Sequence, residues 1–278
     1  MTITGELIEK FNHYLVEEEK SSATLEKYMR DVTAFFAWLA GCELDKLTVL
    51  RYKEHLSNNY APASVNSVLS SLNSFFEYNR WHGLKVKMLK IQKQIFAQRN
   101  KELTKSEYER LLIAAKNKNN ERLYYLMQTI CSSGIRVSEL SAITVDAVKA
   151  HRATINCKGK MRVVILPKDL CKMLSEYAKR QKISSGPVFI TKTGKPLDRC
   201  TIWKMMKALC ESAGVDREKV FPHNLRHLFA RTYYSIQKDI VRLADILGHS
   251  SVNTTRIYTM ETGDVHRRQI QKLGLLRL

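Results

Sequence analysis

The sequence LGHSSVNTTRIY, residues 247–258, decides how the rest of this chain is organised, together with HNLRH at residues 223–227. Both stretches lie in segments that otherwise have the apolar spacing of amphipathic helices, yet they bring histidines, an arginine and a tyrosine close together in the chain. A phenol with its ordinary pKa of about 10 is a poor nucleophile, so a tyrosine that attacks phosphate needs cationic and hydrogen-bonding groups around it. Arg226 and the histidines beside it are candidates for those groups, with Tyr258 as the nucleophile.

The two stretches resemble the H-x-x-R, G-H and tyrosine boxes of the tyrosine recombinases, the phage integrase family, and in particular its short Xer-like bacterial members. In that family the tyrosine lies nine residues after the second histidine, as Tyr258 lies after His249. The family also requires an arginine early in its catalytic domain, and SSGIRVSELSAIT offers Arg136 in the usual G-x-R-x-S-E-L setting. HNLRH, which contains His223 and Arg226, fits the H-x-x-R box without departure.

A β-hairpin is predicted for INCKGKMRVVILP, because two alternating stretches flank a glycine. The family carries a catalytic lysine on such a hairpin, usually at the start of a K-G-x-x-x-R pattern. The resemblance therefore implies Lys158 as the catalytic lysine. The turn is one residue shorter here than in the family pattern, so Lys160 stays open as the alternative.

The resemblance implies transesterification without a metal ion or other cofactor. Tyr258 would attack one phosphodiester of double-stranded DNA, leaving a 3′-phosphotyrosyl bond and a free 5′-OH, and the 5′-OH of a second strand would reverse the step. In this scheme the two arginines hold the nonbridging oxygens, His223 takes or shares the tyrosine proton, His249 hydrogen-bonds the phosphate, and Lys158 acts as general acid. The residues given catalytic roles are Arg136, Lys158, His223, Arg226, His249 and Tyr258.

Each of these residues also has an ordinary structural interpretation. Arg136 has the spacing of a surface ion pair with Glu139, three residues further on. His249 follows a glycine and is suited to a hydrogen-bonded turn, and Tyr258 is suited to a half-buried position in a core. The coincidence of all the boxes at the family's spacings favours the catalytic interpretation.

The sequence disfavours a metal site. His223 and His227 lie at i and i+4, which is the spacing of a zinc-binding H-E-x-x-H helix. Asn224 occupies the position of the glutamate, however, and no third ligand is placed nearby.

Two other classes of protein share some of these features. A type IB topoisomerase uses the same chemistry but religates the same strand, so it would relax supercoils without exchanging strands. A non-enzymatic DNA-binding protein would account for the charge and the helices. It would not account for the ordered series of arginine, lysine, His-x-x-Arg, histidine and tyrosine.

Length and charge agree with a two-domain protein that binds nucleic acid. The chain has 278 residues with 44% hydrophobic content, enough for two cores, and a net charge of +19. Such self-repulsion is tolerated most readily when a polyanion neutralises it, with nucleic acid favoured over an anionic membrane. Residues 1–83 carry 8 basic and 11 acidic side chains, residues 84–101 carry 6 and none, and residues 102–278 carry 32 and 16. We therefore expect a helical domain, a basic linker that contacts the DNA backbone, and a catalytic domain.

The apolar spacing predicts a fold that is mainly α with a small β-sheet. Residues 1–83 have the pattern of four helices, the last beginning near Pro62 and ending near Gly83. The resemblance identifies them as a SAM-like core-binding domain, followed by an α+β catalytic domain. In the second domain we expect a capping box at residues 104–107, the hairpin, a strand in PVFIT at residues 187–191, and a helix over residues 199–213 with Trp203 in the core.

The cellular setting and the partners follow from composition and from the resemblance. Six cysteines without a C-x-x-C pair indicate reduced thiols, and no signal peptide or long apolar run is found, so we expect a cytoplasmic protein that does not enter a membrane. The resemblance implies a homotetramer on double-stranded DNA with paired inverted core sites, with a second recombinase as an open alternative. Residues 264–278 would form a tail passed between protomers or packed on their own domain. The absence of an earlier segment argues against a separate arm-type DNA-binding domain.

Overall fold

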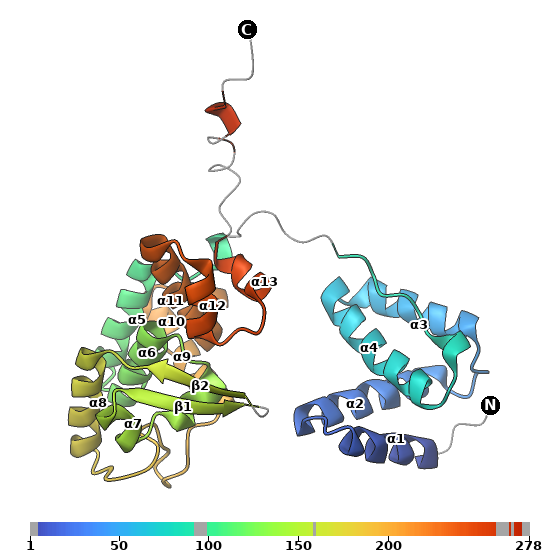
Figure 1. Cartoon of the computed structure of the whole chain (residues 1–278), viewed down its shortest axis with the longest axis horizontal. Helices are drawn as coiled ribbons and strands as arrows, with labels where there is room; N and C mark the ends of the chain where they lie inside the picture. Colours follow the sequence, from blue (N-terminus) through green and yellow to red (C-terminus); the bar gives the residue numbers. More distant parts are fainter. Residues whose placement is uncertain (1–4, 92–98, 158–159, 260–266, 268–269, 274–278) are drawn as a thin grey trace. The chain divides into compact units, whose positions relative to one another are not determined.

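The computed structural model of this chain describes residues 5–91, 99–157, 160–259, 267 and 270–273 (Figure 1). The chain forms two compact units, Met1–Lys93 and Gln94–Leu278. In the described part of the chain, no helix is both long enough and apolar enough to cross a membrane.

The first unit is helical, as the apolar spacing predicts. Its elements are α1 (Gly5–Glu17), α2 (Ser22–Leu39), α3 (Lys46–Asn59), α4 (Pro62–Tyr78) and the 3₁₀ helix η1 (His82–Leu84). Helix α4 begins at the predicted proline but ends before Gly83, because Arg80 adopts a left-handed conformation with φ of 59°. The amide of Trp81 then donates to the carbonyl of Phe76, which closes the end of the helix.

Aromatic rings fill the core of this unit. Phe75 lies at the centre, with the ring of Phe11 edge-on at 5.1 Å and the ring of Phe36 at 5.4 Å between centroids. One carboxylate, Asp31, is also buried there, and it accepts hydrogen bonds from Lys27 at 2.6 Å and from Ser71 at 2.8 Å. The buried polar group is therefore satisfied within the unit.

The second unit consists of helices around one two-stranded sheet. Its helices are α5 (Lys105–Asn117), α6 (Glu121–Ser133), α7 (Val145–Lys149), α8 (Lys168–Arg180), α9 (Arg199–Lys207), α10 (Cys210–Ala213), α11 (Pro222–Gln237), α12 (Ile240–Leu247) and α13 (Val252–Thr255). Its 3₁₀ helices are η2 (Arg99–Lys101), η3 (Val137–Ala142), η4 (Arg217–Lys219) and η5 (Arg256–Tyr258), and its strands are β1 (Arg152–Cys157) and β2 (Lys160–Ile165). The predicted capping box is present, with Thr104 and Glu107 each bonding the other's backbone amide.

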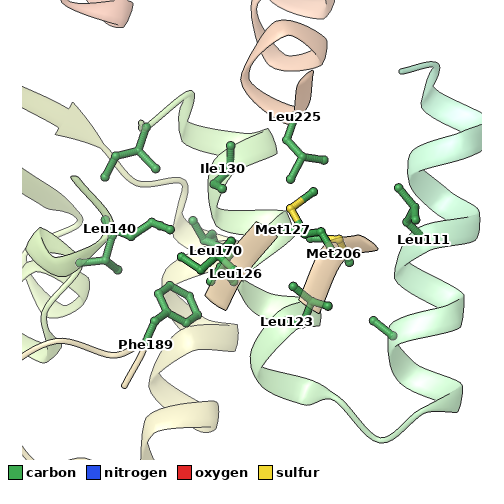
Figure 2. Packing of buried hydrophobic residues seen from close by; sticks show 14 of the residues in the cluster. Leu111, Leu123, Leu126, Met127, Ile130, Leu140, Leu170, Phe189, Met206 and Leu225 are labelled. Atoms are coloured by element: carbon green, nitrogen blue, oxygen red, sulfur yellow. The ribbon is translucent and has the colours of Figure 1, made fainter. Parts of the chain in front are cut away.

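Helix α6 runs through the core of the second unit. Figure 2 shows its side chains, Leu126, Met127 and Ile130 among them, surrounded by residues from neighbouring elements such as Met206 of α9 and Leu225 of α11. Because α6 is held on several sides, the segment that leaves its C-terminus has a defined position. That segment leads to Arg136.

The hairpin is antiparallel, and its pleat directs one face inward. Ile155 of β1 pairs with Arg162 of β2, and Ala153 pairs with Val164. On the opposite face Met161, with 73% of its surface exposed, points away from the core. Arg162 therefore lies on the inward face, because side chains alternate along a strand.

Three predictions about the second unit are wrong. Residues 187–191 form only isolated bridges, because their backbone partners belong to connecting segments and not to a strand with a free edge. The helix expected over residues 199–213 is broken after Lys207 into α9 and α10. Trp203 is 43% exposed, since the buried face of α9 carries Ile202 and Met206 instead.

Candidate active site

The first part of the site is the turn that follows α6. Gly134 ends the helix with a φ of +65°, and a Cβ there would lie 2.5 Å from the ring of Phe229. Glycine meets both requirements, the left-handed conformation and the close approach. The chain then reaches Arg136, which caps the 3₁₀ helix η3.

Arg136 makes two kinds of contact. Its Nη1 donates to Glu139 Oε1 at 2.9 Å, so the ion pair expected from sequence spacing is present. Its Nη2 also donates to the carbonyl of Gly248 at 3.3 Å, a residue more than one hundred positions away. Arg136 therefore lies at the G-H turn and is not only a surface arginine.

Arg226 is the most deeply buried charged residue of the site, with 2% of its surface exposed. It lies one turn into α11, and its guanidinium donates to the carbonyls of Gly134 and, at 2.7 Å, Leu247. Nη2 is also 3.1 Å from Nε2 of His249. Burial, together with the positive charge of Arg136, lowers the pKa of Arg226 to about 10, so the side chain is still cationic at pH 7.

His249 directly follows the left-handed Gly248 at the end of α12. Because a guanidinium can only donate, Nε2 accepts from Arg226, and Nδ1 carries the proton and donates to Thr255 Oγ1 at 2.8 Å. Burial and the nearby Arg226 and Arg136 lower the pKa of His249 to about 4. His249 is therefore neutral at pH 7 in the free protein.

Tyr258 lies in η5 and is almost fully buried, with 4% exposed. The ring of His227 meets it edge-on at 4.8 Å, and the ring of His249 is nearly parallel to it at 6.2 Å. Burial raises the pKa of the phenol, whereas the guanidiniums of Arg226 and Arg136 oppose that shift. The phenol is therefore protonated at pH 7 and needs a base to become a nucleophile.

The two histidines of α11 lie side by side, with 4.5 Å between ring centroids. Burial and the charge of Arg226 lower the pKa of His223, and burial lowers that of His227 to about 4. Asn224 donates to the carbonyls of Lys101 and Lys219, so it holds the start of α11 to the ends of the 3₁₀ helices η2 and η4. No cluster of three metal-ligating side chains occurs among the described residues.

Lys158, the predicted catalytic lysine, lies outside the described residues. The strands that flank it bring a different residue into the site: Arg162 donates through Nη1 to the carbonyl of Ile246 at 3.0 Å and through Nη2 to Glu139. The sequence alone predicted no role for Arg162, and it did not predict that Glu139 is the partner of Arg162. The arginine that ends the family's K-G-x-x-x-R hairpin pattern was the signal from which a role for Arg162 could have been predicted.

Glu139 is the acidic member of the site, with 7% exposed. Burial alone would raise the pKa of its carboxyl, but hydrogen bonds from the Arg136 amide and from the guanidiniums of Arg162 and Arg136 outweigh this and hold the pKa below its usual value. The carboxylate is therefore ionised and orients both arginines.

A cleft of 710 Å³ opens beside these residues. Arg136, His223 and Arg226 line one part of it, and Arg199, Trp203 and Lys204 line another. Apolar side chains, Phe221 and Pro222 among them, share this lining, and its cationic and hydrogen-bonding groups suit the phosphate backbone of a nucleic acid.

Comparison with known proteins identifies the family of both units. The family described as "Phage integrase family" matches residues 101–263, and "Phage integrase, N-terminal SAM-like domain" matches residues 8–83. The tyrosine recombinase XerA of Thermococcus kodakarensis is 31% identical over 290 residues, covering 99% of this chain and 98% of the relative.

Two solved structures share the fold. One is XerH site-specific recombinase bound to difH substrate, at a TM-score of 0.71 and 19% identity, covering 98% of this chain and 85% of that chain. The other is a lambda integrase tetramer bound to a Holliday junction, at a TM-score of 0.71 and 18% identity, covering 93% of this chain and 78% of that chain. Together with the two family matches, the Xer relative shows that this chain belongs to the phage integrase family, as a Xer-like tyrosine-type site-specific DNA recombinase.

Proposed function

We propose that this recombinase exchanges DNA strands through Tyr258. The phenolic oxygen forms a bond to the scissile phosphorus, the bond from phosphorus to the 5′ oxygen breaks, and a 3′-phosphotyrosyl linkage and a free 5′-OH result. The 5′-OH of a second strand then reverses the step and joins the two strands. The observation that supports this most strongly is the meeting of Tyr258, His249 and Arg226, which come from separate segments, around one buried point.

Arg226 and Arg136 are suited to clamp the nonbridging oxygens. Arg226 is already fixed by two backbone carbonyls, and Arg136 by Glu139 and Gly248. Donors held in place before substrate arrives stabilise developing charge without reorganising during the reaction. His249 would add a hydrogen bond to the phosphate from Nε2, once that atom has taken up a proton and given up its bond with Arg226, while Nδ1 stays bonded to Thr255.

Proton transfer would involve one residue on each side of the phosphate. His223 has a lowered pKa and is neutral at pH 7, so it can take the phenolic proton. The 5′ oxygen would receive a proton from Lys158, with Lys160 as the alternative. The antiparallel pairing of β1 with β2, which runs to Cys157 and Lys160, supports a role for a lysine of this hairpin.

The DNA would be bound as paired inverted core sites by a tetramer, with a second recombinase as an alternative partner. The lambda integrase relative, solved as a tetramer on a Holliday junction, supports this assembly. Ile270 and Leu273 near the C-terminus are 66% and 62% exposed, which is consistent with a tail that packs on a neighbouring protomer.

Covalent trapping tests the proposal. The wild type and Tyr258→Phe are incubated with fragmented host DNA, the mixture is denatured, and protein-linked strands are recovered and sequenced. We expect adducts at a recurring inverted sequence for the wild type, and DNA binding without adducts for Tyr258→Phe. A covalent adduct that persists in Tyr258→Phe contradicts the assignment of the nucleophile.

A further inference from the structure

Three consecutive carbonyls at the C-terminal end of α12 each accept a hydrogen bond from a different arginine. The pairs are Arg162 Nη1 with Ile246 at 3.0 Å, Arg226 Nη2 with Leu247 at 2.7 Å, and Arg136 Nη2 with Gly248 at 3.3 Å. The last carbonyls of a helix have no partner within the helix and lie at its negative end. The end of α12 thus holds guanidiniums from three different segments of the chain.

Arg162 bonds two parts of the site at once, as Arg136 and Arg226 also do, but it is the one of these three that comes from the hairpin. Its side chain is 15% exposed, and while Nη1 bonds α12, Nη2 bonds Glu139. The same carboxylate accepts from the backbone amide and from Nη1 of Arg136. Arg162 therefore links the hairpin, α12 and the residue that orients Arg136.

The turn before His249 is shaped around Arg162. Gly248 has a φ of +64°, and a Cβ built on it would lie 2.3 Å from Cδ of Arg162. The missing side chain leaves the space through which the arginine stem passes. The glycine of the G-H pair and the hairpin arginine thus depend on each other sterically.

We propose that Arg162 is a positioning residue for strand cleavage, which holds Arg136 through Glu139 and holds the Gly248–His249 turn through Ile246. It acts on the phosphate only through these neighbours. The inference rests on the proposed cleavage by Tyr258. A small displacement of Arg136 and His249 slows cleavage without weakening the contacts with the DNA backbone on which affinity depends.

The test uses the full chain and a nicked duplex that carries the cleavage sequence recovered by covalent trapping. We expect Arg162→Ala to lower the single-turnover rate of Tyr258 adduct formation by about 100-fold while DNA affinity is unchanged. Arg162→Lys keeps the charge but cannot span both acceptors, so a similar loss is expected. Should the alanine variant fail to fold, Arg162→Met keeps the stem and loses both hydrogen bonds.

Arg110→Ala is the matched control. Arg110 also donates to two carbonyls at a helix end, those of Ala213 and Gly214 at 3.0 and 3.2 Å, but it ties α5 to α10 away from the site. Its loss should lower the melting temperature and leave the cleavage rate unchanged. If Arg110→Ala slows cleavage as much as Arg162→Ala does, Arg162 is merely structural and the proposal is wrong.

The steric link gives a second readout. Gly248→Ala should slow cleavage less in the Arg162→Ala background than in the wild type, because the clash with the arginine stem is gone. Strictly additive effects contradict the proposal, as does an unchanged rate for Arg162→Ala while the wild type forms adducts. If the wild type forms no Tyr258 adduct, the proposed function itself fails and the positioning role falls with it.

Discussion

Two buried carboxylates, one in each unit, show how differently the two parts of this chain are built. Asp31 and Glu139 are 5% and 7% exposed, and they are the two acidic side chains that are buried among the described residues. Asp31 is bound by Lys27 on its own helix and by Ser71 on α4. Glu139 is bound by Arg136 and Arg162.

The difference lies in the balance of charge. In the first unit the buried carboxylate is matched by its neighbours. In the second, Glu139 is the one buried carboxylate beside three arginines, and no carboxylate in the described part of the chain forms an ion pair with Arg226. Surplus buried charge is costly unless a counter-ion arrives. In the first unit the buried charge of Asp31 is thus balanced within the unit. In the second, the positive charge of the arginines exceeds the negative charge of Glu139, and a DNA phosphate would supply the missing negative charge.

The largest effect on the cleavage rate is expected at Arg226, the arginine that forms no ion pair with a described carboxylate. Arg226→Lys should lower the single-turnover cleavage rate by about 10³-fold, because a single ammonium nitrogen cannot replace both Nη1, which bonds Gly134, and Nη2, which bonds Leu247 and His249. Denatured-gel detection of the covalent adduct measures the rate. Arg110→Lys is the control, and a near-normal rate for Arg226→Lys would remove Arg226 from the phosphate clamp.

A core substitution in the first unit should affect stability and leave the chemistry of the second unit intact. Phe75→Ala removes the central ring of an apolar cluster and should lower the free energy of unfolding of that unit by about 3–5 kcal/mol. Urea denaturation of the full chain measures the loss. Val16→Ala on α1, where the side chain is 55% exposed, is the control and should have little effect. An equal loss in both variants contradicts this account of the core.

Anions should stabilise the second unit selectively. Sulfate serves as a probe for phosphate and should raise the melting temperature of the second unit. At a sulfate concentration one hundred times the Kd, the free energy of unfolding should increase by about 2.7 kcal/mol. Trp203 reports this unit, since the chain's other tryptophans, Trp38 and Trp81, belong to the first unit and can be replaced by phenylalanine. The stabilisation by sulfate should be smaller in Arg136→Ala. A shift of equal size in both units would mean that sulfate acts as a general salt.

The smallest effect concerns pH. His227 and His249 have pKa values of about 4, below the ordinary 6.5, so between these values the unfolded chain binds more protons than the folded one. Stability of the second unit should therefore fall as the pH drops from about 6.5 toward 4, by about 2–4 °C in melting temperature for each kcal/mol lost. Thermal melts followed through Trp203 measure this, and His249→Gln should flatten the slope. A pH-independent melt contradicts the burial of neutral histidines.

Patterns of neighbouring residues were sufficient to predict an element wherever contacts between neighbours in the sequence determine it. The four helices of the first unit follow from apolar residues at helical spacing, and the start of α5 follows from the Thr104–Glu107 capping box. The failures involve distant partners. PVFIT has the composition of a strand, but whether it becomes one depends on a free sheet edge, and Trp203 is exposed because neighbours on the other face of α9 fill the core.

The sequence by itself determined the four helices of the first unit, the start of α5, the basic charge and, through the family boxes, the residues to test as catalytic. Only the tertiary structure decided that Arg136, Arg162 and Arg226 share the last carbonyls of α12, and that Glu139 orients two of them. Helix formation depends on neighbours three and four residues apart, which a sequence displays directly. The site depends on contacts between residues more than one hundred positions apart, such as Arg136 and Gly248, and these exist only after the elements of the second unit have packed on one another.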